Sequence, residues 1–147
     1  MENDKQETCE WLKLDNQLCF QLYALSRKIT QLYGPMLKKL DITYPQYLIF
    51  LVMWEHKELS IKEIGSRLHL DTGTLTPMLK RMEQKGWLTR QRDKQDERVV
   101  KIALTESGWS LQPKAVDIPK DLVCAMHLDL EEAAQMRETL KALMQKL

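Results

Sequence analysis

Apolar side chains at steps of three and four residues near the start of the chain predict an amphipathic helix. The stripe consists of Leu14, Leu18, Leu22, Leu25 and Ile29. Polar side chains stand between these positions, and the pair Gly34-Pro35 is typical of a helix end. A short second helical piece is expected from Met36 to Leu40.

Two capping boxes then predict where the next helices begin. Thr43 and Gln46 form the first, directly ahead of the almost entirely apolar run 47–54. Ser60 and Glu63 form the second. We therefore expect a helix that is buried on most sides, followed by a short amphipathic helix.

The segment after the second box predicts one more helix. Thr72 is expected to cap it, and Leu75, Leu79 and Met82 form its inward face. Gly86 is the residue type that commonly follows a helix C-terminus, so the helix should end there.

The hydrophobic period changes beyond this helix. The stretches 87–92 and 99–104 alternate between apolar and polar residues, and the charged segment 93–98 separates them. Two such strands joined by a polar loop predict a β-hairpin.

Helical segments return in the last third of the chain. Thr105 is placed to start a helix, and Pro113 and Pro119 are expected to interrupt or kink it. Asp129 begins a third cap ahead of a final apolar stripe. That stripe consists of Met136, Leu140, Leu143 and Leu147.

Together these elements predict a mainly α fold with a β-hairpin wing (α+β), a winged helix-turn-helix over residues 44–104. The helix pair is expected at about Ile61–Leu68 and Thr72–Lys85. The whole chain, 1–147, fits one domain. Residues 14–33 and 105–147 carry more apolar surface than a small domain covers, which predicts a homodimer through these N- and C-terminal helices. The same stripes could instead pack on the chain's own core.

The distribution of charge along the chain is more informative than the net charge. The net charge is +1, yet eight basic and four acidic residues stand between Lys80 and Lys101. A local surplus of positive charge on an otherwise slightly acidic chain is the pattern expected for phosphate binding. The predicted partner is therefore double-stranded DNA, and a two-fold dimer predicts a palindromic operator.

An α-helix fits the major groove of B-DNA and presents its N-terminal residues to the bases. The candidate DNA-binding residues of the second helix are Thr72, Thr74, Thr76, Pro77, Lys80 and Arg81. Arg98 at the wing is a candidate for the minor groove. Asp96 is spaced to orient the Arg98 guanidinium, although an isolated pair of this kind would mean little.

Cysteine and histidine usage excludes several classes. The three cysteines, Cys9, Cys19 and Cys124, are too few and too scattered for a secreted disulfide framework. The histidines are also dispersed, so we expect no metal site and no cofactor. The polar N-terminus and the lack of a long apolar run predict a cytoplasmic protein that does not enter a membrane. A lone cysteine on an apolar helix face is most often a small core residue.

Several segments resemble the MarR family of dimeric winged-helix regulators, and in particular its organic hydroperoxide sensors, the OhrR repressors. The segments are 14–20 (LDNQLCF), 40–47 (LDITYPQY), 70–86 (LDTGTLTPMLKRMEQKG) and 96–98 (DER). The segment 104–108 (LTESG) is similar to the family more broadly. The resemblance covers most of residues 14–124.

The resemblance implies roles for particular residues. Cys19 matches the peroxidatic cysteine of these sensors, and Tyr33 and Tyr44 match tyrosines that hydrogen-bond it from the partner subunit. Cys124 falls where two-cysteine members place a resolving cysteine, which forms an intersubunit disulfide. Cys9 has no counterpart.

These roles are chemically consistent. A thiolate is the nucleophile toward peroxides, and the early turns of a helix and tyrosine hydroxyls both favour it. Attack gives a sulfenic acid, which a second thiol converts to a disulfide. Apolar neighbours such as Phe20 and Leu22 suit an organic hydroperoxide.

The implied function is a repressor that binds its operator when reduced and is released when Cys19 is oxidised by organic hydroperoxide. A MarR-type repressor released by a small-molecule ligand shares the same fold and is the first alternative. A thiol peroxidase would need turnover with a reductant, which a winged helix does not require. A winged helix that binds only proteins fits poorly with a basic wing. The sequence thus predicts a regulator and not an enzyme.

Overall fold

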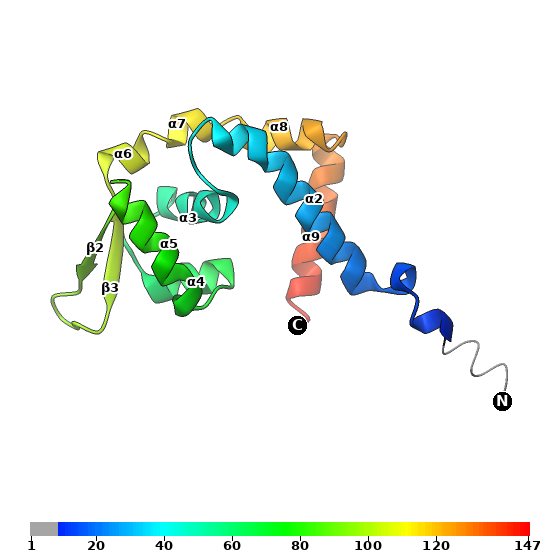
Figure 1. The fold of residues 1–147 in the computed structure, drawn as a ribbon, viewed down its shortest axis with the longest axis horizontal. Helices are drawn as coiled ribbons and strands as arrows, with labels where there is room; N and C mark the ends of the chain where they lie inside the picture. The colour runs from blue at the N-terminus through cyan, green and yellow to red at the C-terminus, as the bar shows by residue number, and fades with distance from the viewer. Residues whose placement is uncertain (1–8) are drawn as a thin grey trace. The chain divides into compact units, whose positions relative to one another are not determined.

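The computed structural model describes residues 9–147 and divides into two compact units (Figure 1). The winged-helix unit comprises residues 35–121. The terminal unit is formed by both ends of the chain, and its described parts are residues 9–34 and 122–147.

The first long helix differs from the sequence prediction at both ends. Leu14–Asn16 forms a short 3-10 helix, η1, and α2 spans Leu18–Lys38. Gln17 has an extended backbone (φ −91°, ψ 112°), which separates the two helices. The expected end at Gly34-Pro35 and the expected separate helix from Met36 were wrong, because α2 continues through both residues. A proline in a helix removes one amide donor but keeps a helical φ, so the remaining backbone hydrogen bonds carry the helix onward.

A left-handed turn ends this part of the chain instead. Asp41 has φ 57°, and the amide of Ile42 donates to the carbonyl of Leu37 at 3.2 Å. Helix α3, Tyr44–Trp54, then begins at the predicted capping box, which is confirmed. The amide of Gln46 donates to Oγ1 of Thr43 at 3.4 Å, and the amide of Thr43 donates to Oε1 of Gln46 at 2.9 Å.

The helix pair is confirmed as α4, Ile61–Leu68, and α5, Thr72–Gln84. The Ser60–Glu63 capping box starts α4 as predicted. The prediction that Thr72 caps α5 was wrong, because the cap is Asp71. Its carboxylate accepts hydrogen bonds from both the amide and the hydroxyl of Thr74, at 2.8 and 2.7 Å.

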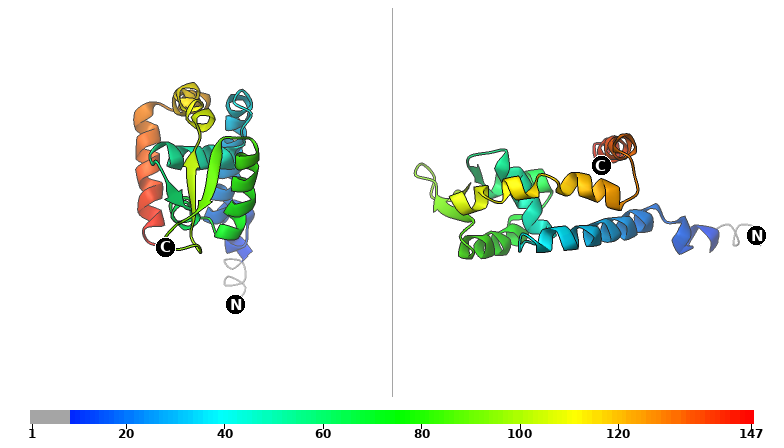
Figure 2. Two further views of the ribbon diagram at one scale, coloured as in Figure 1. Left: turned by 90° about the vertical axis from the view of Figure 1, so that its left-hand side faces the viewer. Right: turned by 90° about the horizontal axis from the view of Figure 1, so that it is seen from above.

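The predicted hairpin is present as β2, Leu88–Arg92, and β3, Val100–Leu104. A two-residue strand that the sequence did not reveal, β1 (Leu59–Ser60), pairs with β3 on its other edge. The sheet is antiparallel in the order β1-β3-β2. In Figures 1 and 2 the hairpin extends beyond the helices of this unit as a wing.

The core of the winged-helix unit collects apolar side chains from α3, α4, α5 and the sheet. Side chains with no exposed surface include Phe50, Ile64, Leu75, Leu79 and Ile102. The Phe50 ring stacks on Trp54 and meets Trp87 edge-on. This burial fixes α5 against the sheet, which determines how the outer face of α5 is presented.

Short helices follow the wing, as the prolines predicted. They are α6 (Glu106–Trp109), α7 (Gln112–Ala115) and α8 (Ile118–Ala125). The last helix, α9 (Leu130–Met144), begins at the predicted Asp129 cap and buries none of its residues. No helix among residues 9–147 combines the length and apolar character that a membrane span needs.

Candidate DNA-binding surface and redox cysteines

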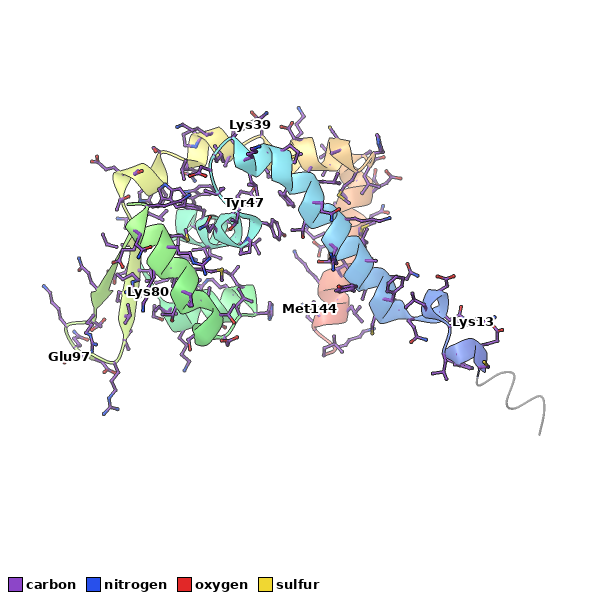
Figure 3. The ribbon with its side chains drawn as sticks, viewed as in Figure 1. Lys13, Lys39, Tyr47, Lys80, Glu97 and Met144 are labelled. Carbon is purple, nitrogen blue, oxygen red and sulfur yellow. The ribbon has the colours of Figure 1, made fainter. Side chains whose placement is uncertain are left out.

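The outer face of α5 carries the predicted DNA-contact residues. Leu75, Leu79 and Met82 are 0 % exposed and hold the opposite face to the core. Five of the predicted residues are exposed: Thr72, Thr74, Pro77, Lys80 and Arg81. Figure 3 shows Lys80 on α5 and Glu97 at the tip of the wing.

Two of the predicted hydroxyls already make bonds within the helix. Thr76 is half-buried, and its hydroxyl donates to the carbonyl of Thr72 at 2.7 Å. The Thr74 hydroxyl donates to Asp71, and its oxygen is still able to accept a hydrogen bond from an incoming donor. The hydrogen bonds from Thr74 lower the pKa of Asp71, so this carboxylate stays ionised at the start of α5.

The basic residues of the segment 80–101 divide into two groups. Lys85 pairs with Asp41 at 2.6 Å, Arg90 pairs with Glu83 at 2.9 Å, and Lys101 lies 3.7 Å from Glu58 and 3.9 Å from Asp93. The charges of the first group are therefore engaged within the protein. The second group is exposed and makes no ion pair with any residue from 9 to 147: Lys80, Arg81, Arg92, Lys94 and Arg98. Within this group, Arg92 donates a hydrogen bond to the carbonyl of Glu97 at 3.2 Å.

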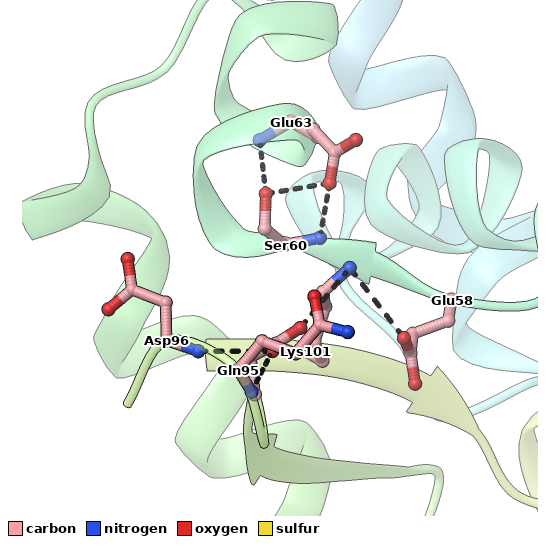
Figure 4. Close-up of polar contacts among 7 residues, drawn as sticks. Glu58, Ser60, Glu63, Gln95, Asp96 and Lys101 are labelled. Atoms are coloured by element: carbon pink, nitrogen blue, oxygen red, sulfur yellow. Dashed lines mark hydrogen bonds and ion pairs between the residues drawn. The ribbon is translucent and has the colours of Figure 1, made fainter. Parts of the chain in front are cut away.

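Carboxylates shape the wing tip (Figure 4). Oδ1 of Asp93 accepts hydrogen bonds from the amides of Gln95 and Asp96, at 2.7 and 3.3 Å, and these bonds lower the pKa of Asp93. Asp96 accepts from the backbone amide of Arg98 at 3.0 Å. We expected Asp96 to hold the Arg98 guanidinium; in this structure it fixes the backbone instead, because the two residues stand on one tight turn.

Cys19 is the second residue of α2, and its side chain is exposed and free. The helix starts at Leu18 rather than at Leu14, which puts the cysteine in the first turn. Amide groups without helical partners and the positive end of the helix dipole lie at that turn. Cys124 in α8 and Cys9 near the start of the described chain are also exposed and free.

The two predicted sensor-supporting tyrosines are half-buried. Tyr33 lies in α2, and Tyr44 is the first residue of α3. Burial raises the pKa of Tyr44, so its hydroxyl stays protonated at neutral pH and is able to donate a hydrogen bond. Across residues 9–147, no group of three or more metal-binding side chains comes together.

Several known proteins are similar to this chain in sequence. The family described as transcriptional regulator SarA/Rot matches residues 31–114. The organic hydroperoxide resistance transcriptional regulator of Bacillus subtilis is 53% identical over 136 residues, which covers 92% of each chain.

Solved structures extend the likeness to three dimensions. AbfR, known from Staphylococcus epidermidis, is 38% identical in its reduced form bound to DNA, with a TM-score of 0.76 over 97% of each chain. Its overoxidised DNA-bound form gives 0.75 over 97% and 99% of the chains, and its disulfide form gives 0.61 over 99% and 95%. A mutant of Escherichia coli MarR with operator DNA is 27% identical, with a TM-score of 0.77 over 86% and 92% of the chains.

A helix pair, an exposed recognition face and a basic wing define a winged-helix transcriptional regulator, and its relatives are regulators rather than enzymes. The chain belongs to the MarR family and, within it, groups with the organic hydroperoxide resistance regulator of Bacillus subtilis. Redox-sensing regulation of transcription is therefore the class of function that it serves.

Proposed function

We propose that this protein is a homodimeric repressor that binds a palindromic operator when Cys19 is reduced and leaves it when organic hydroperoxide oxidises Cys19. The observation that carries the proposal is the exposed, free thiol of Cys19 in the first turn of α2. Such a thiol is open to a bulky peroxide and lies where a helix favours negative charge. The likeness to the Bacillus subtilis regulator supports the choice of oxidant.

The DNA side of the proposal uses two contacts per subunit. The first turns of α5 enter the major groove, where Thr72, Thr74 and Pro77 meet base edges or phosphates. Lys80 and Arg81 neutralise phosphates farther along the helix. Arg98 reaches the minor groove from the wing, on the turn that Asp93 and Asp96 stabilise.

The redox side proceeds in two balanced steps. The Cys19 thiolate attacks the hydroperoxide, an S–O bond forms, the O–O bond breaks, and the alcohol leaves after taking a proton. The thiolate of Cys124 in the partner subunit then attacks the sulfenic sulfur. An S–S bond forms and the oxygen leaves as water, so two thiols are oxidised for each peroxide reduced.

Tyr33 and Tyr44 support the first step in this proposal. A protonated tyrosine hydroxyl donates a hydrogen bond to the sulfur, which stabilises the thiolate. Burial keeps Tyr44 protonated, consistent with that role.

The dimer follows from surface that the chain leaves exposed. Leu18, Leu25 and Leu32 on α2 are exposed, as are Met136 and Leu140 on α9. A second copy would cover these helices and set the spacing of the two recognition helices near one DNA turn, about 34 Å. A disulfide between Cys19 and Cys124 joins α2 of one subunit to α8 of the other, and we expect it to change that spacing.

Overoxidised AbfR has been crystallised bound to DNA, so overoxidation does not by itself exclude DNA binding in that relative. By analogy, over-oxidised Cys19 alone should weaken operator binding less than the Cys19–Cys124 disulfide does.

Fluorescence anisotropy on DNA from upstream of the protein's own gene tests the proposal. We compare untreated protein, protein treated with cumene hydroperoxide and then with thiol, and the variants Cys19→Ser and Cys124→Ser. Binding should be lost on oxidation, restored by thiol, and unaffected by peroxide in Cys19→Ser. A non-reducing gel should show a dimer band that either substitution removes.

Three outcomes would contradict the proposal. A response that persists in Cys19→Ser indicates a ligand-released regulator instead. Equal oxidation rates with cumene hydroperoxide and hydrogen peroxide remove the preference for organic oxidants. Catalytic consumption of peroxide in the presence of thiol, instead of stoichiometric consumption, indicates a peroxidase.

A further inference from the structure

A recess of about 350 Å³ lies between the start of α4, the start of α5 and the part of the wing that leads into β3. Its lining residues are Ser60, Ile61, Lys62, Thr72, Arg98, Val99 and Val100. Thr72 is the first residue of the recognition helix, and Arg98 is the minor-groove candidate. The recess therefore separates the two elements that are proposed to enter different grooves.

The geometry of B-DNA indicates which part of the duplex would lie in this recess. The major and minor grooves of B-DNA are divided by a sugar-phosphate strand. A protein that inserts α5 into one groove and the wing into the next must straddle that strand. We infer that the recess seats the strand between the grooves, and that Lys62 binds a phosphate of it, an inference that rests on the proposed DNA-binding function.

The lining matches a sugar-phosphate strand in both of its parts. Ile61, Val99 and Val100 are half-buried and form an apolar wall suited to the face of a deoxyribose. The charged residues of the recess, among those the structure describes, are Lys62 and Arg98, and both are exposed cations. An apolar lining that also carries two cations fits a strand that alternates sugar and phosphate.

Two neighbouring carboxylates make their contacts with groups other than Lys62. Glu63 follows Lys62, but its carboxylate accepts hydrogen bonds from the amide and the hydroxyl of Ser60, both at 2.7 Å. Glu58 lies 3.7 Å from the ammonium of Lys101. Figure 4 shows both interactions beside the wing. Lys62 makes no ion pair with any residue from 9 to 147, so its charge is available for DNA.

A phosphate contact has a signature that base contacts lack. It should raise affinity for operator and non-specific DNA alike, and it should add about 0.9 to the slope of log K against log salt for each phosphate neutralised. Lys62 is thus expected to supply affinity and register without sequence preference.

The test measures salt-dependent anisotropy of reduced protein on operator and on unrelated duplex DNA. Lys62→Gln should weaken both by about three- to tenfold and should reduce the salt slope by about 0.9 per bound subunit. Lys62→Arg should retain both affinity and slope. Lys114→Gln in α7 removes the same charge from an exposed residue outside the recess and should change neither.

Neutral methylphosphonate groups, placed one at a time along the operator, then identify the phosphate. At one position the effect of Lys62→Gln should vanish, because the contact is already lost. Overturning results are an unchanged slope in Lys62→Gln, an equal loss in Lys114→Gln, or the same Lys62→Gln effect at every methylphosphonate position. If the unsubstituted protein binds neither duplex, the proposed function itself fails, which separates that outcome from a failure at Lys62.

Discussion

The winged-helix unit and the terminal unit use apolar residues in opposite ways. In the winged-helix unit, each main element turns its apolar side chains inward, and Ile64, Leu75 and Ile102 are completely buried. In the terminal unit, α9 extends over fifteen residues with none buried, and Leu130 is 68 % exposed. Both units contain regular, well-capped helices, so the difference lies in packing and not in helix formation.

This difference shows which part of the molecule is complete within one chain. Packing of an amphipathic face, more than intrinsic propensity, stabilises helices in water. The winged-helix unit provides that packing from its own residues. The terminal helices present apolar faces that a second copy would cover, and substitutions in each unit should separate the two cases.

A core substitution in the winged-helix unit should give the largest effect. Leu79 is completely buried, and Leu79→Ala should lower the free energy of unfolding by about 2–5 kcal/mol, because it removes buried methyl groups and leaves a cavity. Urea titration checks this, and the loss should be the same at every protein concentration. Met136→Ala on α9 is the matched change, and its cost should shrink as the protein is diluted, because a contact across the dimer stabilises the fold only while dimers are present. Concentration-independent behaviour of both variants contradicts the dimer.

Alanine substitutions at two glycines should change the stability of the protein in opposite directions. A Cβ at Gly108 would lie 2.1 Å from the carbonyl oxygen of Trp87, so Gly108→Ala should cost on the order of 3 kcal/mol. A Cβ at Gly34 meets nothing within 4 Å, and the residue lies inside α2. Gly34→Ala should therefore stabilise the protein by about 0.5–1 kcal/mol. Thermal unfolding measures both, and destabilisation by Gly34→Ala would show that α2 needs flexibility there.

A charge on the exposed face of α9 should act on DNA binding rather than on the winged-helix core. Leu140→Arg should produce monomers and reduce operator affinity by about a hundredfold, because the two half-sites are then bound separately. Light scattering and anisotropy together check this. Gln145→Arg adds the same charge at the end of α9 and should leave both unchanged. A monomer that retains full affinity would refute the role of the terminal helices.

The smallest effect concerns the cap of α5 and its dependence on pH. Hydrogen bonds from Thr74 place the folded-state pKa of Asp71 below its ordinary value of 3.8. Its stabilising contribution is therefore fully present above about pH 4 and is lost as the pH falls through the lower, folded-state pKa. In thermal unfolding from about pH 6 to about pH 2, the difference between wild type and Asp71→Asn should shrink toward the acid end. A constant difference would show that the carboxylate charge is not involved.

The sequence predicted the elements whose signals are local. The capping boxes at Thr43, Ser60 and Asp129 each depend on residues three positions apart, and all three start helices as expected. Resemblance located the segment 104–108, and the structure supplies its physical reason: Thr105 bonds the carbonyl of Gly86, and Gly108 packs against the backbone of Trp87.

The features that sequence reasoning missed depend on contacts between distant residues. Strand β1 is two residues long, too short to show a period, and it exists because Leu59 pairs with Ile102. The bond between Lys85 and Asp41 joins residues 44 positions apart. The recess beside Lys62 combines three segments that no spacing rule connects. Asp71, by contrast, could have been found, since aspartate is a preferred cap and Thr74 stands three residues later.

The division of the chain into two units also determines the order in which their residues are completed during translation. The winged-helix unit is continuous in sequence, from residue 35 to residue 121, whereas the terminal unit needs both ends of the chain. Domains generally fold as units during synthesis, beginning with the parts made first. Every residue of the winged-helix unit has therefore been translated before α9 exists, and the proposed dimer surface is completed last. A ribosome that stalls within the final helix would already carry the residues of an entire winged helix, without the helix that we propose binds a second copy and so allows competition for an operator.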